Sequence, residues 1–333
     1  MIVLLGSSGY FGGAFAAELR RRGVSFIPLT RSAFDYTRFD YLFDYLRNMK
    51  PAFLINAAGF VCPPEQEGSE KAREQSMLAN ALLPQMVARV CLMTKTPWGH
   101  VSSGSIYTGA KIVEHGEARV ERDLSRRRLR EHFDQHPERF AGFNETDEPN
   151  YSFRHPPVSF YSGTKALAEE AIRHIGQSYI WRLRLPFNEK DSPCNFLSQI
   201  QGQASLPDTV DSFSHLGDCV RACLELWYVN APFGIYNVTN PGAVSLRRLA
   251  EALLAAGTLT RLPEFAAAPE TPSPAVEKTL PSHCILDASK LLNAGVKLRG
   301  LDEALQDSLQ KMRHGGRSAP PTRIIPRPPV PPS

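Results

Sequence analysis

Three glycines between a short apolar run and a helical pattern constrain this 333-residue chain more than any other feature. Residues 2–5 are all apolar, Gly6, Gly9 and Gly12 follow, and apolar side chains then recur with helical spacing over residues 10–22. Each glycine removes a Cβ, which permits a tight turn, a close approach of the backbone to a pyrophosphate, and close packing of helix on strand. An anion would lie at the helix N-terminus, where free N–H groups and the helix dipole favour it. The pattern therefore predicts a strand, a turn and a helix around a dinucleotide site.

Strand and helix patterns alternate along the chain. Apolar strand patterns occupy residues 24–29, 53–55, 100–102 and 179–185, and helical patterns occupy residues 39–46, 70–93, 160–175, 246–254 and 301–312. Strands that are apolar throughout are typical of a parallel sheet that helices cover on both faces. The predicted fold class is α/β, a Rossmann-type doubly wound parallel sheet with a smaller C-terminal substrate lobe.

The same patterns divide the chain into parts. Residues 1–185 form the predicted dinucleotide-binding Rossmann domain, with a polar insertion at residues 108–157 in which one helix is expected near residues 121–135. The insertion follows the carboxyl end of a strand, a position suited to a lid over the active-site edge of the sheet. Residues 186–312 form an expected substrate-binding lobe interleaved with the core. Residues 313–333 are rich in Pro and Arg and are expected to be disordered.

Composition limits the class of protein. Hydrophobic residues make up 42% and charged residues 22% of the chain, a balance typical of globular proteins. No run approaches the ~20 apolar residues that span a bilayer, and the N-terminus lacks the pattern of a secretory signal. The net charge of +4 is concentrated at residues 126–130 and after Met312, which gives no broad nucleic-acid footprint. We therefore expect a cytoplasmic protein that binds neither membrane nor nucleic acid.

The cysteines and histidines form no metal motif. The six cysteines include no CxxC pair, so neither a disulfide framework nor a zinc ribbon is expected. His132 and His136 share a helical face but have no third ligand, and we interpret them as a surface pair. Cys219 and Cys223 have the same spacing on an apolar helix and are expected in the core. No metal is predicted.

The end of the second predicted strand bears on the choice of cofactor. A site selective for NAD places Asp or Glu there, where the carboxylate binds the adenosine 2′-hydroxyl. This chain has Arg31, which is suited to a charge-assisted contact with a 2′-phosphate, although an ordinary surface arginine is the alternative. Asp35 and Tyr36 are positioned to flank the adenine. NADP(H) is therefore the preferred cofactor, with NAD(H) as the second choice.

Tyr161 and Lys165 carry the strongest chemical signal. They lie four residues apart at the start of a helical pattern, which places both side chains on one helix face. A tyrosine with a pKa of ~10 is a poor acid near neutrality, but a neighbouring cation lowers that pKa. Ser103, which follows the strand at residues 100–102, would hydrogen-bond the reacting oxygen and orient it toward Tyr161. Each pattern alone is common on helix surfaces or at caps, and together they predict proton transfer to a carbonyl.

The motifs in combination resemble the extended short-chain dehydrogenase/reductases. The matching residues are Gly6, Gly9, Gly12, residues 56–59 (Asn-Ala-Ala-Gly), Ser103, Tyr161 and Lys165. Within that superfamily the chain is most similar to the dTDP-4-dehydrorhamnose reductases and to the plant epimerase/reductases that complete UDP-rhamnose. Further similar stretches are residues 160–165, 182–186, 237–242 and 286–291. The resemblance extends from residue 1 to about residue 313.

The resemblance implies roles for individual residues. Ser103, Tyr161 and Lys165 are its catalytic triad. The cofactor-lining residues that it implies are Tyr10, Phe11, Asn56, Ala57, Ala58, Asn80 and Ser102, with Tyr161 and Lys165. The substrate-contacting residues that it implies are Ser105, Asn188, Asn195 and Phe196.

The activity implied is reduction of a nucleotide-linked 4-keto-6-deoxy sugar, with a homodimer formed through two helices as a further expectation. Two alternatives stay open: a non-catalytic NADP-binding regulatory subunit, and a redox-neutral nucleotide-sugar epimerase or dehydratase. The plant enzymes carry a cysteine as epimerisation acid/base where this chain has Ser105, and a serine is a much weaker proton carrier. This difference favours reduction without epimerisation.

Overall fold

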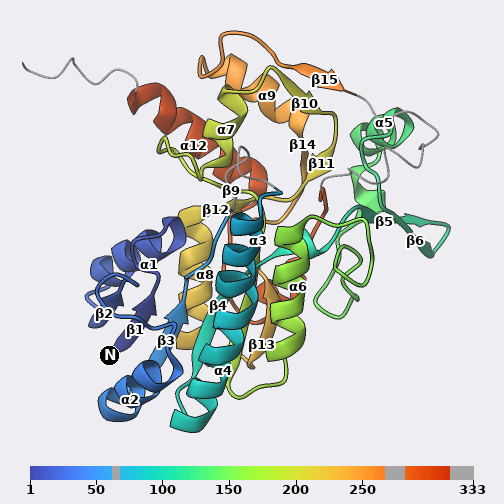
Figure 1. The fold of residues 1–333 in the computed structure, drawn as a ribbon. Coiled ribbons are helices and arrows are strands. Elements are labelled where there is room, and N and C mark those ends of the chain that lie inside the picture. The colour runs from blue at the N-terminus through green and yellow to red at the C-terminus, as the bar shows by residue number, and fades with distance from the viewer. Residues whose placement is uncertain (62–67, 267–281, 316–333) are drawn as a thin grey trace, which may run out of the picture.

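A parallel six-stranded sheet forms the centre of the protein, which we describe from a computed structural model at residues 1–61, 68–266 and 282–315. The strand order is β2-β1-β3-β4-β8-β13 (Figure 1). The strands are β1 (Ile2–Leu5), β2 (Phe26–Leu29), β3 (Phe53–Asn56), β4 (Trp98–Ser103), β8 (Ser178–Leu183) and β13 (Gly234–Asn237). The order reverses between β1 and β3, so their carboxyl ends border the crevice where such sheets bind ligands.

Helices cover both faces of this sheet (Figure 1). One face carries α1 (Tyr10–Arg21) and α8 (Leu216–Tyr228), and the other carries α2 (Phe39–Met49), α4 (Leu83–Thr94) and α6 (Phe160–Ile172). Alternation along β1 supplies both cores, because Ile2 and Leu4 pack on one face while Val3 and Leu5 pack on the other. The predicted doubly wound α/β fold is confirmed.

The helical pattern predicted at residues 70–93 forms one continuous helix that contains an irregular turn. It consists of α3 (Glu70–Met77), a π-helical turn (Leu78–Leu82) and α4. Among the described residues, 70–94 is the one helix that is long and apolar enough to cross a membrane. Core helices of soluble proteins meet the same criterion, and 44% of the relevant window is buried here, so this is weak evidence for a span.

The insertion differs from its prediction. The chain forms a hairpin of β5 (Ala110–Glu114) and β6 (Glu117–Glu121), followed by α5 (Arg127–Gln135) and β7 (Phe140–Ala141). The expected helix at residues 121–135 is therefore wrong before residue 127. The reason is a two-residue turn at His115 and Gly116, which both have positive φ and which close a hairpin with the favoured twist.

Backbone bridges and a buried ion pair connect the insertion to the rest of the protein. Gly109 forms a bridge with Cys284, and Phe143 forms one with Leu286. The buried Arg130 of α5 donates to Asp208 at 3.1 Å. These contacts attach the insertion to the C-terminal half of the chain, and its role as a lid stays a prediction.

After residue 186 the chain alternates between the sheet and a smaller lobe. Helix α8 and strand β13 belong to the sheet layers, whereas the lobe has an apolar core of its own. The lobe contains α7 (Phe196–Gln201), α9 (Leu246–Ala255), α12 (Leu301–Gly315) and the strand pairs β9 (Pro186–Phe187) with β12 (Ser214–His215), β10 (Ser205–Pro207) with β15 (Glu264–Ala266), and β11 (Val210–Asp211) with β14 (Val244–Ser245). Helix α11 (Ser289–Asn293) packs near β13.

The predicted helices at residues 246–254 and 301–312 are confirmed. Residues 313–315 continue α12, so the expectation of disorder from residue 313 is wrong there. The rest of the tail, from residue 316, lies outside the described residues. Cys219 and Cys223 are buried in the sheet core, as expected.

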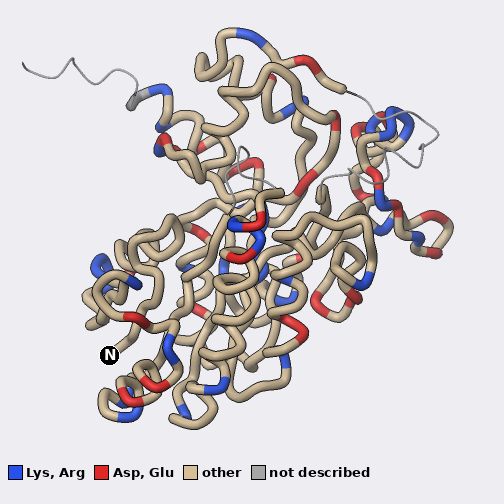
Figure 2. Tube along the Cα trace, viewed as in Figure 1, with Lys and Arg blue, Asp and Glu red and all other residues tan. Residues whose placement is uncertain are grey.

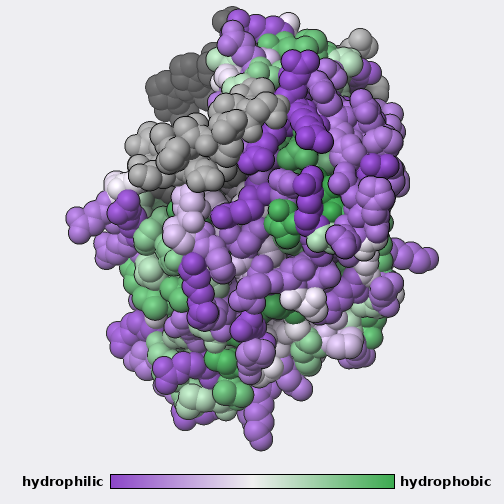
Figure 3. Space-filling model, turned by 90° about the vertical axis from the view of Figure 1, so that its right-hand side faces the viewer, coloured by the Kyte–Doolittle hydropathy of each residue, from purple (hydrophilic) through white to green (hydrophobic). Residues whose placement is uncertain are grey.

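Charges of both signs are interspersed along the described chain, including the arginine-rich α5 (Figure 2). Seen from the side of the insertion, the surface is mostly hydrophilic and its apolar residues form separate small areas (Figure 3). The rings of His132 and His136 lie 5.4 Å apart on α5. Within the described ranges, no three His, Cys, Asp or Glu side chains are grouped as a metal site requires.

Candidate active site

The glycine turn lies at the junction of β1 and β3. Gly6 has a φ of 72°, and the Gly9 N–H donates to the Gly6 carbonyl at 3.0 Å. A Cβ on Gly6 would lie 2.6 Å from the Ala58 nitrogen, and one on Gly12 would lie 2.0 Å from the Gly6 oxygen. Backbone therefore occupies the space that side chains would need. The turn leads into the N-terminus of α1, and this bare backbone cradle fits a dinucleotide pyrophosphate.

Tyr36 belongs to the apolar core on the side of the sheet that α2 and α4 cover. Its ring is buried in this core, and burial raises the pKa of its hydroxyl. The core covers most of the ring, and the predicted contact of Tyr36 with an adenine stays a prediction. Arg31 and Asp35 are exposed just after β2, where Arg31 is available to an anion and Asp35 accepts a hydrogen bond from the Thr37 N–H at 3.2 Å.

The loop after β3 is ordered by amide side chains. The Asn56 Oδ1 accepts from the Ala58 N–H at 3.1 Å, and the Ala57 N–H donates to Leu5 at 3.1 Å. Asn80, in the π-helical turn, binds both the N–H and the carbonyl of Phe60, at 2.9 and 2.7 Å. These predicted cofactor residues hold the loop backbone in place opposite the glycine turn.

Lys165 lies against this loop. A Cβ on Gly59 would be 3.6 Å from the Lys165 Nζ and 3.3 Å from the Asn80 Oδ1. The Nζ donates to the Val101 carbonyl at 3.2 Å. Burial lowers the pKa of Lys165 to about 8, and the charge on Glu169 opposes that shift. Lys165 therefore carries its proton below this pH and presents it beside the predicted cofactor loop.

Two buried side chains of β4, His100 and Ser102, lie near Lys165. His100 of β4 bonds to Asn56 at 3.3 Å, and burial together with the Lys165 charge keeps the pKa of His100 well below its usual value. Ser102 donates to Glu169 at 2.5 Å, and Glu169 pairs with Arg182 at 2.8 Å. The hydroxyl of Ser102, predicted to line the cofactor, is directed to α6 instead.

Tyr161 of α6 lies near Ser103, the last residue of β4. Helix α6 begins at its N-cap Ser159, whose hydroxyl accepts from the Ser162 N–H at 3.1 Å, so Tyr161 lies in the first turn. Burial raises the pKa of Tyr161, whereas a hydrogen bond with Ser103 and the charge on Arg184 oppose the rise. The Lys165 Nζ is 5.9 Å from the Tyr161 ring centroid. The structure therefore brings the three predicted catalytic side chains together.

Arg184 is a site residue that sequence reasoning missed. It is buried just past β8, and its guanidinium makes paired contacts of 2.6 Å with both oxygens of Asp211. Its Nη1 donates to the Ser105 Oγ at 2.9 Å. His283 adds a bond of 3.0 Å from its Nδ1 to Asp211. The sequence did contain a signal for this role, because an arginine at the end of an apolar strand is expected to be buried, and a buried arginine needs a charged partner.

The predicted substrate residues Asn188 and Asn195 organise a loop. The Asn195 Nδ2 donates to the carbonyls of Asn188 and Lys190 at 2.8 and 2.6 Å, and its Oδ1 accepts from the Leu197 N–H at 3.1 Å. The buried Asn195 amide is thus bonded within the loop, and its direct contact with a substrate stays a prediction. Phe196 packs against Phe213 in the lobe core, with ring centroids 5.4 Å apart.

This loop lies close to the glycine turn. Burial raises the pKa of Tyr10, and the charges of Cys194 and Glu189 act in the same direction, which places the loop beside the start of α1. The neighbouring Phe11 ring contacts Tyr10 edge-on at 5.7 Å. The lobe therefore borders the candidate cofactor site from the side of α1.

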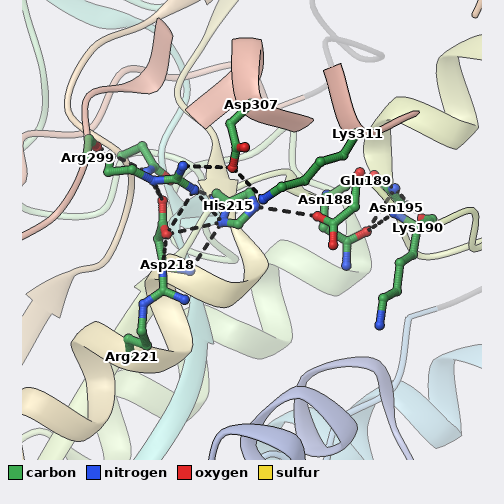
Figure 4. A network of polar contacts seen from close by, with 11 residues as sticks. Asn188, Glu189, Lys190, Asn195, His215, Asp218, Arg221, Arg299, Asp307 and Lys311 are labelled. Carbon is green, nitrogen blue, oxygen red and sulfur yellow. Dashed lines mark hydrogen bonds and ion pairs between the residues drawn. The ribbon is translucent and has the colours of Figure 1, made fainter. Parts of the chain in front are cut away.

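A polar network fixes the lobe to the sheet layers (Figure 4). Asp218, in the first turn of α8, accepts from the Arg299 Nε at 2.9 Å and lies near His215. Burial would raise the pKa of Asp218, but its hydrogen bonds with His215 and Arg299 outweigh burial and lower it. Arg299 also contacts Asp307 of α12 at 2.9 Å. The network joins α8 to the C-terminal helix and gives the lobe a fixed position.

Comparison with known proteins places this geometry in a family. The family model of the RmlD substrate binding domain matches residues 1–314. The chain belongs to this family. A trifunctional UDP-glucose 4,6-dehydratase/UDP-4-keto-6-deoxy-D-glucose 3,5-epimerase/UDP-4-keto-L-rhamnose-reductase of Arabidopsis thaliana is 26% identical over 75% of this chain and 33% of that protein. A dTDP-4-dehydrorhamnose reductase of Mycolicibacterium smegmatis is 24% identical over 92% of this chain and 84% of that protein.

The chain therefore spans about a third of the length of the trifunctional relatives that it matches. Among solved structures, the L780 UDP-rhamnose synthase of Acanthamoeba polyphaga mimivirus aligns with a TM-score of 0.74 and 17% identity, over 93% of this chain and 99% of that one. A dTDP-4-dehydrorhamnose reductase from Bacillus anthracis in complex with NADP aligns with a TM-score of 0.68 and 15% identity, over 94% and 97%. These structural likenesses show the fold.

Proposed function

We propose that this protein uses NADPH to reduce the C4 ketone of a nucleotide-linked 4-keto-6-deoxy sugar. The observation that carries the proposal is the convergence of Ser103, Tyr161 and Lys165 beside the glycine turn. The RmlD-family relatives that are named as reductases of keto-deoxyhexoses support the same chemistry.

Each residue of the site has a role that follows from its contacts. NADPH, when bound, supplies the hydride. Tyr161 holds the proton that the carbonyl oxygen takes up, because burial raises the pKa of its hydroxyl and keeps it protonated. Ser103 donates a hydrogen bond to the oxygen on which negative charge develops. Lys165, fixed by the Val101 carbonyl, binds on the side of the cofactor loop.

A panel of nucleotide-linked sugars tests this proposal. The purified protein should oxidise NADPH, read at 340 nm, with at least one dTDP- or UDP-linked 4-keto-6-deoxyhexose. Cofactor binding without oxidation of any sugar would reject the proposal and favour the regulatory subunit. A sugar converted with no net change in absorbance would favour the redox-neutral epimerase or dehydratase.

Selectivity for NADPH is proposed to depend on Arg31. We predict that Arg31→Glu will weaken NADPH binding about 10- to 100-fold, the range expected for a lost charge-assisted hydrogen bond. NADH binding should change little or improve, because it carries no 2′-phosphate. Fluorescence titration with both cofactors is the measurement.

Arg47→Glu, which reverses an exposed charge on α2, is the matched control for changes in net charge. It should leave the ratio of NADPH to NADH affinity unchanged. If Arg31→Glu lowered the affinities for NADPH and NADH by the same factor, a contact of Arg31 with the 2′-phosphate would be contradicted.

We also propose that the protein acts in the cytoplasm as a homodimer through α4 and α6, without membrane or nucleic-acid partners. Exposed apolar side chains on these helices, Leu92, Met93 and Leu167, support an interface there. Light scattering on the purified protein tests it, and a monomeric mass at micromolar concentration would reject it.

A further inference from the structure

His215 lies beside a loop at the carboxyl edge of the sheet (Figure 4). This loop, residues 188–195, begins where β9 ends, and β9 follows β8 closely along the chain. Strand β9 pairs with β12, which ends at His215. Sheets of this kind bind ligands in the crevice outside the carboxyl ends of their strands. A movement of the 188–195 loop would therefore change access to that crevice.

The two ring nitrogens of His215 have different surroundings. Nδ1 accepts the N–H of Asp218 at 3.2 Å, which makes His215 the N-cap of α8. This bond needs the lone pair of Nδ1, so a neutral ring carries its proton on Nε2, and a charged ring carries one there as well. The side chain is only 8% exposed, and within the described part of the chain no acceptor lies at hydrogen-bonding distance from Nε2. His215 therefore presents a buried donor without an acceptor.

This donor points toward the loop. The Glu189 Oε2 lies 3.9 Å from the His215 Nε2, and the Glu189 side chain is 31% exposed. An N–H···O hydrogen bond is about 2.9 Å long, so Glu189 is about 1 Å too distant to form one. Buried donors in folded proteins are nearly always bonded. A small movement of the loop toward His215 would satisfy the donor.

We propose that His215 is a positioning residue that holds the 188–195 loop closed over the sugar through a hydrogen bond from its Nε2 to the Glu189 carboxylate. The inference rests on the proposed reductase function, since it assigns a role at the edge of that same site. It adds a pair of residues outside the group of Ser103, Tyr161 and Lys165.

Hydrogen bonds inside the loop make it move as one piece. The Asn195 Nδ2 donates to the carbonyls of Asn188 and Lys190 at 2.8 and 2.6 Å. The Asn195 N–H donates to the Ser192 carbonyl at 2.9 Å. These bonds join the two ends of the loop, so a shift of Glu189 carries its neighbours along. Asn188 and Asn195 are the predicted substrate residues, and closure therefore acts on the affinity for the sugar.

The other partner of the proposed bond is held in place. Arg299 donates to Asp218 at 2.9 Å and to Asp307 of α12 at 2.9 Å, and its Nη2 lies 3.5 Å from the His215 Nδ1. The Phe187 ring packs edge-on against the His215 ring, with centroids 5.3 Å apart. Closure is therefore a movement of the loop toward a fixed donor.

His215→Asn and Glu189→Ala test the bond from its two sides. Asn is among the best N-cap residues, so His215→Asn keeps the cap of α8 and removes the Nε2 donor. Each variant should raise KM for the sugar about 10-fold, the loss expected for one hydrogen bond to a carboxylate, and leave kcat within about twofold. The double variant should lose no more than either single one. Glu189→Gln keeps an acceptor oxygen and should restore part of the affinity.

NMR of ¹⁵N-labelled histidine reports the bond without any reduction of sugar. The Nε2 signal of His215 is assigned from its loss in His215→Asn. It should shift in wild type when NADP⁺ is added together with dTDP or UDP, because the loop then closes. The shift should be absent in Glu189→Ala.

His132→Asn is the matched control, because it breaks a similar pair, in which the His132 Nε2 lies 3.7 Å from Glu114 in the insertion. It should leave KM unchanged. A protein that reduces the sugar with unchanged KM in His215→Asn and Glu189→Ala would overturn the inference alone, as would a His215 signal that does not shift. Glu189→Ala decides if His215→Asn does not fold. A His215 signal that shifts in a protein that reduces no sugar would refute the proposed function and leave the His215–Glu189 bond standing.

Discussion

Tyr161→Phe will lower kcat for reduction by a factor of about 10² to 10⁴, the range over which a positioned general acid contributes. The substitution removes one oxygen and keeps the ring, which lies in the first turn of α6. The hydroxyls of Ser103 and Ser105 are bonded to each other, and Ser105 also accepts from Arg184, so neither is placed to replace it. The affinity for NADPH should change little, since the substitution leaves the glycine turn and the Tyr161 ring in place. Steady-state kinetics and a cofactor titration on one preparation measure both quantities.

Tyr236→Phe is the matched control for that substitution. It also removes a buried hydroxyl, which donates to the Pro232 carbonyl at 2.7 Å at the edge of the sheet. Its kcat should equal that of wild type. A Tyr161→Phe enzyme that keeps more than about a tenth of the wild-type kcat would exclude a general-acid role for this phenol. Ser103→Ala combined with Tyr161→Phe should cost little more than Tyr161→Phe alone, because groups that act as a unit are not additive.

The part of the site that sequence reasoning predicted is the part encoded by local signals. A glycine turn after a strand specifies its own geometry, and the Tyr161–Lys165 spacing specifies one helix face. The structure confirms both, with Gly6 at a φ of 72° and both side chains directed toward β4. Such features need no knowledge of distant residues, which explains why the fold class and the positions of the glycine turn and of the Tyr161–Lys165 helix could be predicted together.

Contacts across long stretches of sequence were not predictable in this way. Arg184 and Asp211 are 27 residues apart, and Asp211 and His283 are 72 apart. Each is an ordinary charged residue in its own segment, and only the fold brings them together. Asn195 shows the converse: its motif predicts a substrate contact, but three neighbouring backbone groups use its amide. Local pattern identifies a residue that matters without identifying its partner.

The hairpin of the insertion was missed for another reason. Charged residues dominate residues 117–131, and helical spacing of charges outweighed the turn at His115 and Gly116. The useful signal was the alternation along β5, where Ala110 and Ile112 are buried whereas Lys111 and Val113 are less so. Alternation with a period of two beside a glycine predicts a hairpin, whereas charge spacing alone predicts no structure.

Gly12→Ala will abolish cofactor binding, whereas Gly13→Ala will not. The new Cβ at residue 12 would lie 2.0 Å from the Gly6 carbonyl oxygen and 2.7 Å from its carbon, so turn and helix must separate. A shift of about 1 Å in a positioned site can reduce activity or affinity on the order of 100-fold, and NADPH affinity should fall by at least that factor.

Gly13 is the matched control. No atom lies within 4 Å of the position that its Cβ would take, and Gly13 lies in the exposed part of the first turns of α1. Alanine there should raise stability by about 0.5–1 kcal/mol, because it restricts the unfolded chain and favours helix. Thermal unfolding and NADPH titration of the two variants separate the effects. Equal affinity in Gly12→Ala and wild type would mean that the pyrophosphate does not bind at this turn, and the cofactor site would have to be sought elsewhere on the sheet.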